Sequence, residues 1–152
     1  VRHGMGKTFD NAALTYHLQQ AQQSGVLLML LVIVGYPTET LEDFEATKQW
    51  FKDNARYAST VYHVGFSPAA ILPNTKLARK AKEYNIVVGN IPSVWSMTDS
   101  NITPKMKFDH QVELNKICDE LNYNSLVDLG RRNSIEKAHT DAALENIVTY
   151  EV

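Results

Sequence analysis

The chain has 152 residues, of which 44% are hydrophobic, 9% aromatic and 21% charged, values typical of an ordinary globular domain. Its 15 Lys and Arg and 17 Asp and Glu residues give a net charge of −2 without a basic block, which argues against a nucleic-acid partner. The single cysteine, Cys118, excludes an internal disulfide and an all-cysteine metal or iron–sulfur site made by this chain alone. The longest apolar run, Val26–Val34, has about half of the roughly 20 residues that a membrane span needs, so we expect no membrane partner.

The chain starts at Val1, without a methionine and without the basic, apolar and small-residue regions of a signal peptide. We therefore interpret it as a piece of a longer, cytoplasmic polypeptide. Its length is that of a typical single domain, but a piece of this length need not be a whole domain.

The first predicted elements are a helix and a strand. Thr8 or Asp10 can cap a helix that ends near Ser24, because Gly25 stands at the usual stop position. The run Val26–Val34 is apolar at every position and bounded by glycines, which favours a strand buried on both faces. Such strands occur in parallel sheets that are covered by helices.

A second helix and a second strand are predicted next. Thr40 and Asp43 resemble a capping box for a helix that runs to about Asn54. Its predicted core stripe comprises Leu41, Phe44, Thr47 and Phe51. Residues from Thr60 to Phe66 form the second strand, which Ser67-Pro68 ends. A sequence that alternates helices and strands in this way is typical of wound α/β folds.

The second half of the chain is predicted to be mainly helical. A helix is expected from Lys76 to about Tyr84, followed by a long loop from Ile86 to Phe108. Another helix should span about Pro104 to Leu121. Its inward positions are predicted to be Leu114, Ile117, Cys118 and Leu121. Residues 124–152 offer two short helical patterns.

The sharpest local pattern stands where the first strand ends. Gly35 directly follows the strand, and a glycine there lets another group approach the backbone closely. The carboxyl ends of parallel strands are where α/β proteins bind ligands. Glu39, at the head of the next helix, is favoured by the helix dipole in any case. The pattern alone therefore fits either a ligand site or a tight turn with an acidic first helical turn.

Taken together, the patterns resemble the back half of the radical S-adenosylmethionine superfamily. The family's fifth strand and the helix start after it are matched by Ile33, Gly35, Pro37, Glu39, Thr40 and Asp43, while Leu31 replaces a family glycine. The family's "PGT-x-L" at the sixth strand is matched by residues 73–77, and its "VR-x-x-M-x-K" by residues 1–7. Trp95 and residues 101–104 are similar to members that carry a cobalamin-binding domain.

This resemblance implies a fold and a cofactor-binding surface. Residues 1–85 would supply the last two parallel strands and flanking helices of a partial (β/α) barrel, and residues 86–152 a loop and a helical extension. In the family, the residue at Ile33 packs against the adenine of S-adenosylmethionine, and Gly35 lets the cofactor in. Backbone around Phe66 and Ser67 meets the adenine amino group, while Glu39 mainly fixes the turn.

The resemblance also implies what this piece lacks. The family's cluster ligands, C-x-x-x-C-x-x-C, would lie before Val1, and we predict Cys118 to be a buried, inert thiol. The parent enzyme would use S-adenosylmethionine and a 4Fe–4S cluster, with cobalamin as a further cofactor in the related group. It would cleave S-adenosylmethionine reductively to a 5′-deoxyadenosyl radical, whereas this chain alone would be inactive. The sequence identifies no substrate.

Two other interpretations stay open. One is a fragment of an ordinary phosphate-binding α/β barrel enzyme, although Gly35-Tyr36-Pro37 offers one glycine for a phosphate. The other is a non-catalytic module whose Trp95 loop and helical tail bind a partner protein.

A truncated sheet carries an expectation of its own. The strand Val26–Val34 should have one neighbour, Thr60–Phe66, and a free edge. Burying each Leu, Ile or Val is worth roughly 1.5–3 kcal/mol, so an uncovered edge and face should drive self-association through this surface.

Overall fold

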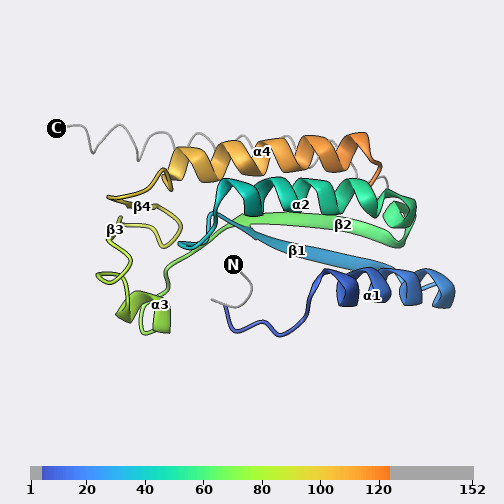
Figure 1. Ribbon diagram of the computed structural model, residues 1–152, viewed down its shortest axis with the longest axis horizontal. Helices are drawn as coiled ribbons and strands as arrows, with labels where there is room; N and C mark the ends of the chain where they lie inside the picture. The colour runs from blue at the N-terminus through green and yellow to red at the C-terminus, as the bar shows by residue number, and fades with distance from the viewer. Residues whose placement is uncertain (1–4, 124–152) are drawn as a thin grey trace.

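A computed structural model describes residues 5–123 of the chain (Figure 1). The elements, in chain order, are α1 (Asn11–Ser24), β1 (Leu28–Val34), α2 (Leu41–Asp53), the 3-10 helix η1 (Ala55–Thr60), β2 (Val61–Pro68), α3 (Lys76–Arg79), β3 (Ile86–Val88), β4 (Trp95–Met97) and α4 (Pro104–Glu120). This order and the parallel pairing of β1 with β2 confirm an α/β fold. The helical patterns expected in residues 124–152 lie outside the described part of the chain.

Local capping signals place the ends of the first two helices. The Asp10 side chain accepts a hydrogen bond from the Ala13 backbone N–H at 2.8 Å, and Gly25 ends α1 in the left-handed conformation with φ of 67°. Thr40 and Asp43 form the expected capping box of α2. Both helices therefore begin and end within a residue or two of the sequence prediction.

β1 and β2 form a two-stranded parallel sheet. Leu31 lies opposite Gly65, and Ile33 lies opposite Ser67. Among the described strands β1 pairs with β2 alone, so its other edge carries no strand, as predicted.

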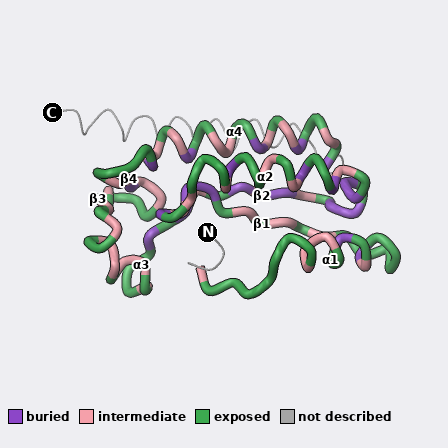
Figure 2. The backbone as a smooth tube through the Cα atoms, in the orientation of Figure 1, coloured by how far each residue is buried: buried purple, intermediate pink, exposed green. Residues whose placement is uncertain are grey.

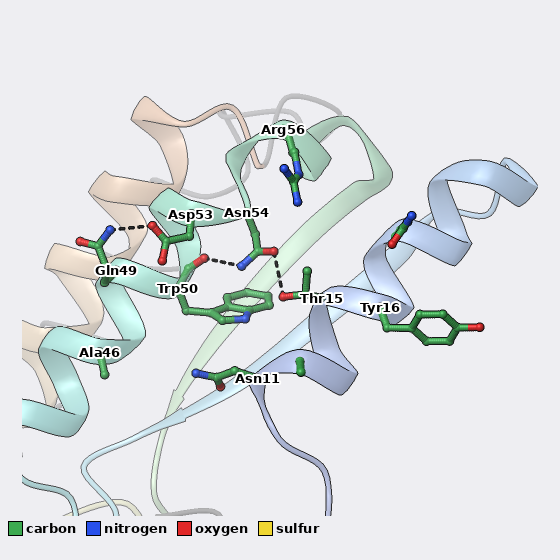
Figure 3. Close-up of a pocket in the computed structure, with 11 residues that line it drawn as sticks. Asn11, Thr15, Tyr16, Ala46, Gln49, Trp50, Asp53, Asn54 and Arg56 are labelled. Atoms are coloured by element: carbon green, nitrogen blue, oxygen red, sulfur yellow. Dashed lines mark hydrogen bonds between the residues drawn. The ribbon is translucent and has the colours of Figure 1, made fainter.

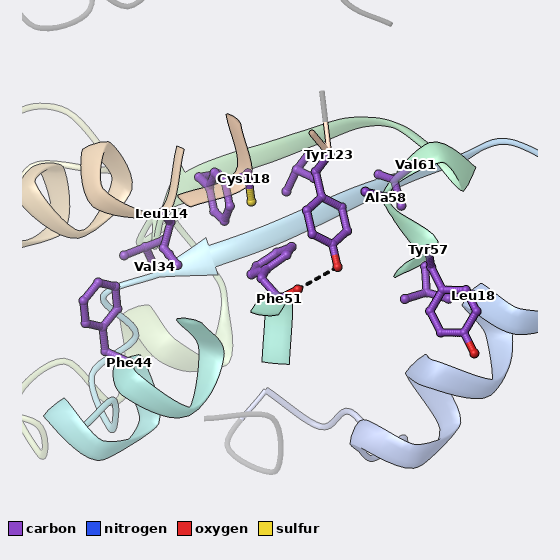
Figure 4. Close-up of a cluster of buried hydrophobic side chains, with 12 residues drawn as sticks. Leu18, Val34, Phe44, Phe51, Tyr57, Ala58, Val61, Leu114, Cys118 and Tyr123 are labelled. Carbon is purple, nitrogen blue, oxygen red and sulfur yellow. Dashed lines mark hydrogen bonds between the residues drawn. The ribbon is translucent and has the colours of Figure 1, made fainter. Parts of the chain in front are cut away.

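One face of this sheet packs against α2 and α4 and forms the main core (Figures 2 and 4). The core residues of these four elements are Val34, Phe44, Phe51, Val61, Val64, Phe66, Leu114 and Cys118. Phe51 lies at the centre, with edge-to-face contacts to Phe66 at 5.7 Å and to Tyr123 at 5.2 Å between ring centroids. The Tyr123 hydroxyl donates to the Phe51 carbonyl at 2.9 Å. Cys118 is fully buried, which confirms its predicted core position.

The opposite face of β1 is open, so the prediction of a strand buried on both faces is wrong for the described chain. Met29, Leu31 and Ile33 are exposed, Leu31 by 75%. Apolar residues at every position cannot tell which face is covered. In the structure, α2 and α4 pack on the same face of the sheet, and the other face of β1 is exposed.

Two helix predictions also need correction. Leu41, expected in the core stripe, is 65% exposed because it is the first residue of α2, beyond the contacts that bury Phe44 and Phe51. α3 ends at Arg79 rather than near Tyr84. The Lys80 N–H donates to the carbonyls of both Lys76 and Leu77. This shared hydrogen bond tightens the last helical turn, and non-helical turns follow it.

The predicted loop from Ile86 to Phe108 contains an antiparallel hairpin. Strand β3 pairs with β4, and Val88 lies opposite Trp95. Trp95 is buried in a second cluster with Ala69, Ile71 and Ile102. Its indole N–H donates to the Ala69 carbonyl at 2.7 Å, which ties the hairpin to the segment after β2.

Phe51→Ala and Leu41→Ala test the core assignment as a pair, since the sequence pattern places both residues on one stripe. Phe51→Ala should lower the free energy of unfolding by about 3–5 kcal/mol, because it empties the centre of the core. Leu41→Ala should change it by less than about 0.5 kcal/mol, because the side chain is exposed. Urea denaturation measures both. Equal losses would contradict this placement of α2.

Candidate functional site

The carboxyl ends of β1 and β2 lie at one edge of the sheet, and two predicted site residues meet there. Ile33 and Ser67 are cross-strand partners, and both side chains are exposed on the open face. An apolar and a hydroxyl side chain thus stand side by side where parallel sheets bind ligands.

The other two predicted site residues are placed differently. The Phe66 side chain lies in the core on the covered face, and its carbonyl accepts a hydrogen bond from the Gln111 side-chain amide at 2.9 Å. Gly35 follows the end of β1 with φ of 71°. Phe66 therefore offers only its backbone, and Gly35 belongs to the turn beyond the strand.

Glu39 holds this turn together. Its Oε2 accepts hydrogen bonds from the Gly35 N–H at 2.7 Å and from the Tyr36 N–H at 3.2 Å. Burial raises the pKa of the Glu39 carboxyl, and these two N–H groups and the nearby His110 partly offset that rise. Glu39 therefore fixes the strand-to-helix turn, the role that the family resemblance implies for it.

The His110 ring packs beside this carboxylate. Its Nδ1 lies 3.8 Å from Oε1 of Glu39, and the ring stacks on Phe44 with 3.6 Å between centroids. The start of α4 is thereby tied to the first turn of α2.

Gly35 is closely approached by Lys107, a residue that sequence reasoning missed. A Cβ built on Gly35 would lie 2.1 Å from Cγ of Lys107 and 2.5 Å from its Cδ. The Lys107 amine donates to the carbonyls of Ser93 and Trp95, both at 3.0 Å. Lysine is normally a surface residue, so the sequence carries no signal for this burial.

The exposed groups at the carboxyl ends of the strands are an apolar face and a few polar atoms beside it. Among residues 5–123 no three His, Cys, Asp or Glu side chains lie close enough to hold a metal ion. The apolar open face, the Ser67 hydroxyl and the backbone at the strand ends can hold a flat molecule with polar edges.

A separate pocket of about 650 Å³ lies between α1 and α2 (Figure 3). Within its lining, the Asn54 side chain donates to the Trp50 carbonyl at 2.8 Å and accepts from the Thr15 hydroxyl at 3.0 Å. Asn54 directly precedes η1 and Arg56 lies within it, and η1 leads into β2, which places this pocket toward the amino-terminal ends of the strands. We therefore place the candidate site at the carboxyl edge instead.

The chain matches no protein-family model and no curated protein. None of the helices within residues 5–123 has the length and apolar character needed to cross a membrane.

Gly35→Ala and Gly25→Ala test the close approach of Lys107, since both glycines have positive φ. Gly25→Ala should cost about 1–2 kcal/mol of backbone strain, because nothing lies within 4 Å of its added Cβ. Gly35→Ala should cost about 1–3 kcal/mol more, because its Cβ meets the Lys107 stem. Denaturation of both variants measures the difference.

A Lys107→Ala background supplies the control. The extra cost of Gly35→Ala should shrink there, because the obstructing Cγ and Cδ are gone. An excess that persists unchanged would contradict the contact.

Proposed function

We propose that this chain is the C-terminal part of a radical S-adenosylmethionine enzyme, and that β1 and β2 are the last two strands of its partial (β/α) barrel. The observation that carries the proposal is the one-sided sheet. In a barrel, each strand has helices on its outer face and the lumen on its inner face, whereas a doubly wound sheet has helices on both. The covered face packed against α2 and α4, together with the open apolar face, is consistent with a barrel wall.

Under this proposal the carboxyl edge of the sheet binds the adenine of S-adenosylmethionine. Ile33 offers an apolar contact to the flat ring, and Ser67 and the Phe66 backbone lie beside it for the polar edge. The Gln111 amide holds the Phe66 carbonyl in place. Gly35 makes the turn at the carboxyl end of β1 and leaves room for the Lys107 stem.

The parent is proposed to be a cytoplasmic enzyme whose 4Fe–4S cluster is bound by a preceding segment. The cluster, when bound, supplies the electron that cleaves the sulfonium to methionine and a 5′-deoxyadenosyl radical. The residues described here do not suit the cluster, because Cys118 is fully buried in the core. The likeness to cobalamin-bearing members extends the proposal to cobalamin as a further cofactor of the parent.

The phosphate-barrel interpretation is less well supported. A phosphate at the turn after β1 would need free backbone N–H groups there. The N–H groups of Gly35 and Tyr36 are already bonded to the Glu39 carboxylate. The Glu39 carboxylate thus takes up the N–H groups that a bound phosphate would need.

The interaction-module interpretation is less well supported too. It has the Trp95 loop and the helical tail bind a partner protein, and the tail lies outside the described residues. Trp95 is 1% exposed and bonded to Ala69, so it offers no contact surface.

We further propose that the isolated chain self-associates through β1. No described strand pairs with the edge of β1 opposite β2, and Met29, Leu31 and Ile33 are exposed on one face of the same strand. An uncovered edge and apolar face of this kind favour association between chains.

Anaerobic reconstitution with iron and sulfide tests the proposed enzyme class. The longer polypeptide should contain C-x-x-x-C-x-x-C upstream of Val1 and take up one 4Fe–4S cluster per chain, seen by iron analysis and visible absorbance. This 152-residue chain should take up none. A longer polypeptide without that motif, or one that binds no cluster, would overturn the proposal.

Sedimentation of Leu31→Lys and Leu41→Lys tests self-association, because both leucines are exposed but only Leu31 is on β1. Leu31→Lys should weaken association about tenfold or more, because the charge must be desolvated in the interface. Leu41→Lys should associate like the unchanged chain. An unchanged chain that stays monomeric at high concentration would refute this part of the proposal.

A further inference from the structure

Lys107 is buried in an unusual way for a lysine. The residue is 1% exposed, although lysines are almost never fully buried unless they are paired with a carboxylate. None of the ion pairs found within residues 5–123 includes Lys107. Among the described residues, a charged amine at this position therefore has no carboxylate to offset its loss of hydration.

The Lys107 side chain joins three parts of the fold. Its stem lies against Gly35, at the turn after β1. Its amine donates to the carbonyls of Ser93 and Trp95 and lies 3.7 Å from the centroid of the Trp95 ring. The side chain thus links α4 and the end of β1 to the β3–β4 hairpin.

The hairpin is held from its other side by backbone and indole contacts. The Ile71 N–H donates to the Pro92 carbonyl at 2.7 Å, and the Trp95 indole N–H donates to the Ala69 carbonyl at 2.7 Å. Lys107 therefore closes the hairpin against α4, while Ala69 and Ile71 hold it to the segment after β2.

Other titratable groups lie on the elements around Lys107. They are Tyr36, Glu39, Asp99, Lys105, Asp109 and His110. The Glu39 carboxylate bonds to the turn N–H groups and faces His110, while Lys105 and Asp109 pair with each other at 2.6 Å. No ion pair within residues 5–123 includes Lys107, and burial lowers the pKa of its amine from 10.5 to about 7.

We propose that Lys107 is a proton-dependent clamp, which keeps the β3–β4 hairpin closed when its amine is neutral and lets it open when the amine takes up a proton. A neutral amine keeps two N–H donors, enough for the carbonyls of Ser93 and Trp95. A protonated amine is better hydrated, and opening the hairpin gives it access to water.

The direction of the pH effect follows from proton binding. The open form, with an exposed lysine, holds its proton up to about pH 10.5, whereas the closed form loses it near pH 7. Between these values the open form binds more protons, so raising the pH favours the closed form. This inference does not depend on the proposed enzymatic function.

Hydrogen exchange of hairpin amides in the whole 152-residue chain tests the clamp. The reporters are Gly89, whose N–H bonds to Val94, and Ile71, whose N–H bonds to Pro92. After correction for the intrinsic exchange rate, their opening constant should fall close to tenfold per pH unit above about pH 7 and level off below it. An opening constant that does not change between about pH 7 and pH 8.5 would overturn the proposal.

Two variants localise the effect. Lys107→Met keeps the apolar stem and should abolish the pH dependence. Lys105→Met, on the exposed side of the same helix, should keep it. The same slope in Lys107→Met as in the unchanged chain would assign the effect to another group and overturn the proposal.

Carbon-13 NMR of the lysine side chains supplies a test that needs no variant. The Cε signal of Lys107 should titrate near pH 7. If that signal does not titrate near pH 7, the clamp is refuted even where Lys107→Met fails to fold.

Discussion

The close packing at Gly35 is the constraint on which the rest of the structure depends. Gly35 turns the chain with a positive φ, and two contacts meet at this turn. The Glu39 carboxylate binds the turn's N–H groups, and the Lys107 stem occupies the space that a Cβ on Gly35 would need. Glu39 fixes the turn that leads into α2, and Lys107 links α4 and the hairpin to the end of β1. Only glycine meets these demands together, because any Cβ would collide with the lysine.

This arrangement leaves the molecule one-sided. α2 and α4 converge on the same face of β1 and β2, where Phe51 and Tyr123 complete the core (Figure 4). Apolar residues remain exposed on the other face of β1. A strand that is apolar on both faces suits a place in a larger sheet better than an exposed position, and this links the fold to the proposed barrel.

Local signals in the sequence predicted the fold well wherever a few neighbouring residues decide the structure. Asp10, Gly25 and the Thr40–Asp43 pair act through hydrogen bonds to nearby backbone, so their patterns located the helix ends. The open face of β1 and the exposure of Leu41 depend on where distant helices pack, which an apolar pattern does not encode. The candidate site divides in the same way: the Glu39 turn was predicted, whereas the burial of Lys107 arises from contacts across more than 70 residues of sequence.

The central claim is that β1 and β2 end a barrel wall whose carboxyl edge holds S-adenosylmethionine. Its most direct test is an experimental structure of the longer polypeptide with S-adenosylmethionine bound. We predict a parallel strand along the edge of β1 opposite β2, and adenine in contact with Ile33 beside Ser67. If the edge of β1 stays unpaired, or the adenine binds away from Ile33, the account is wrong.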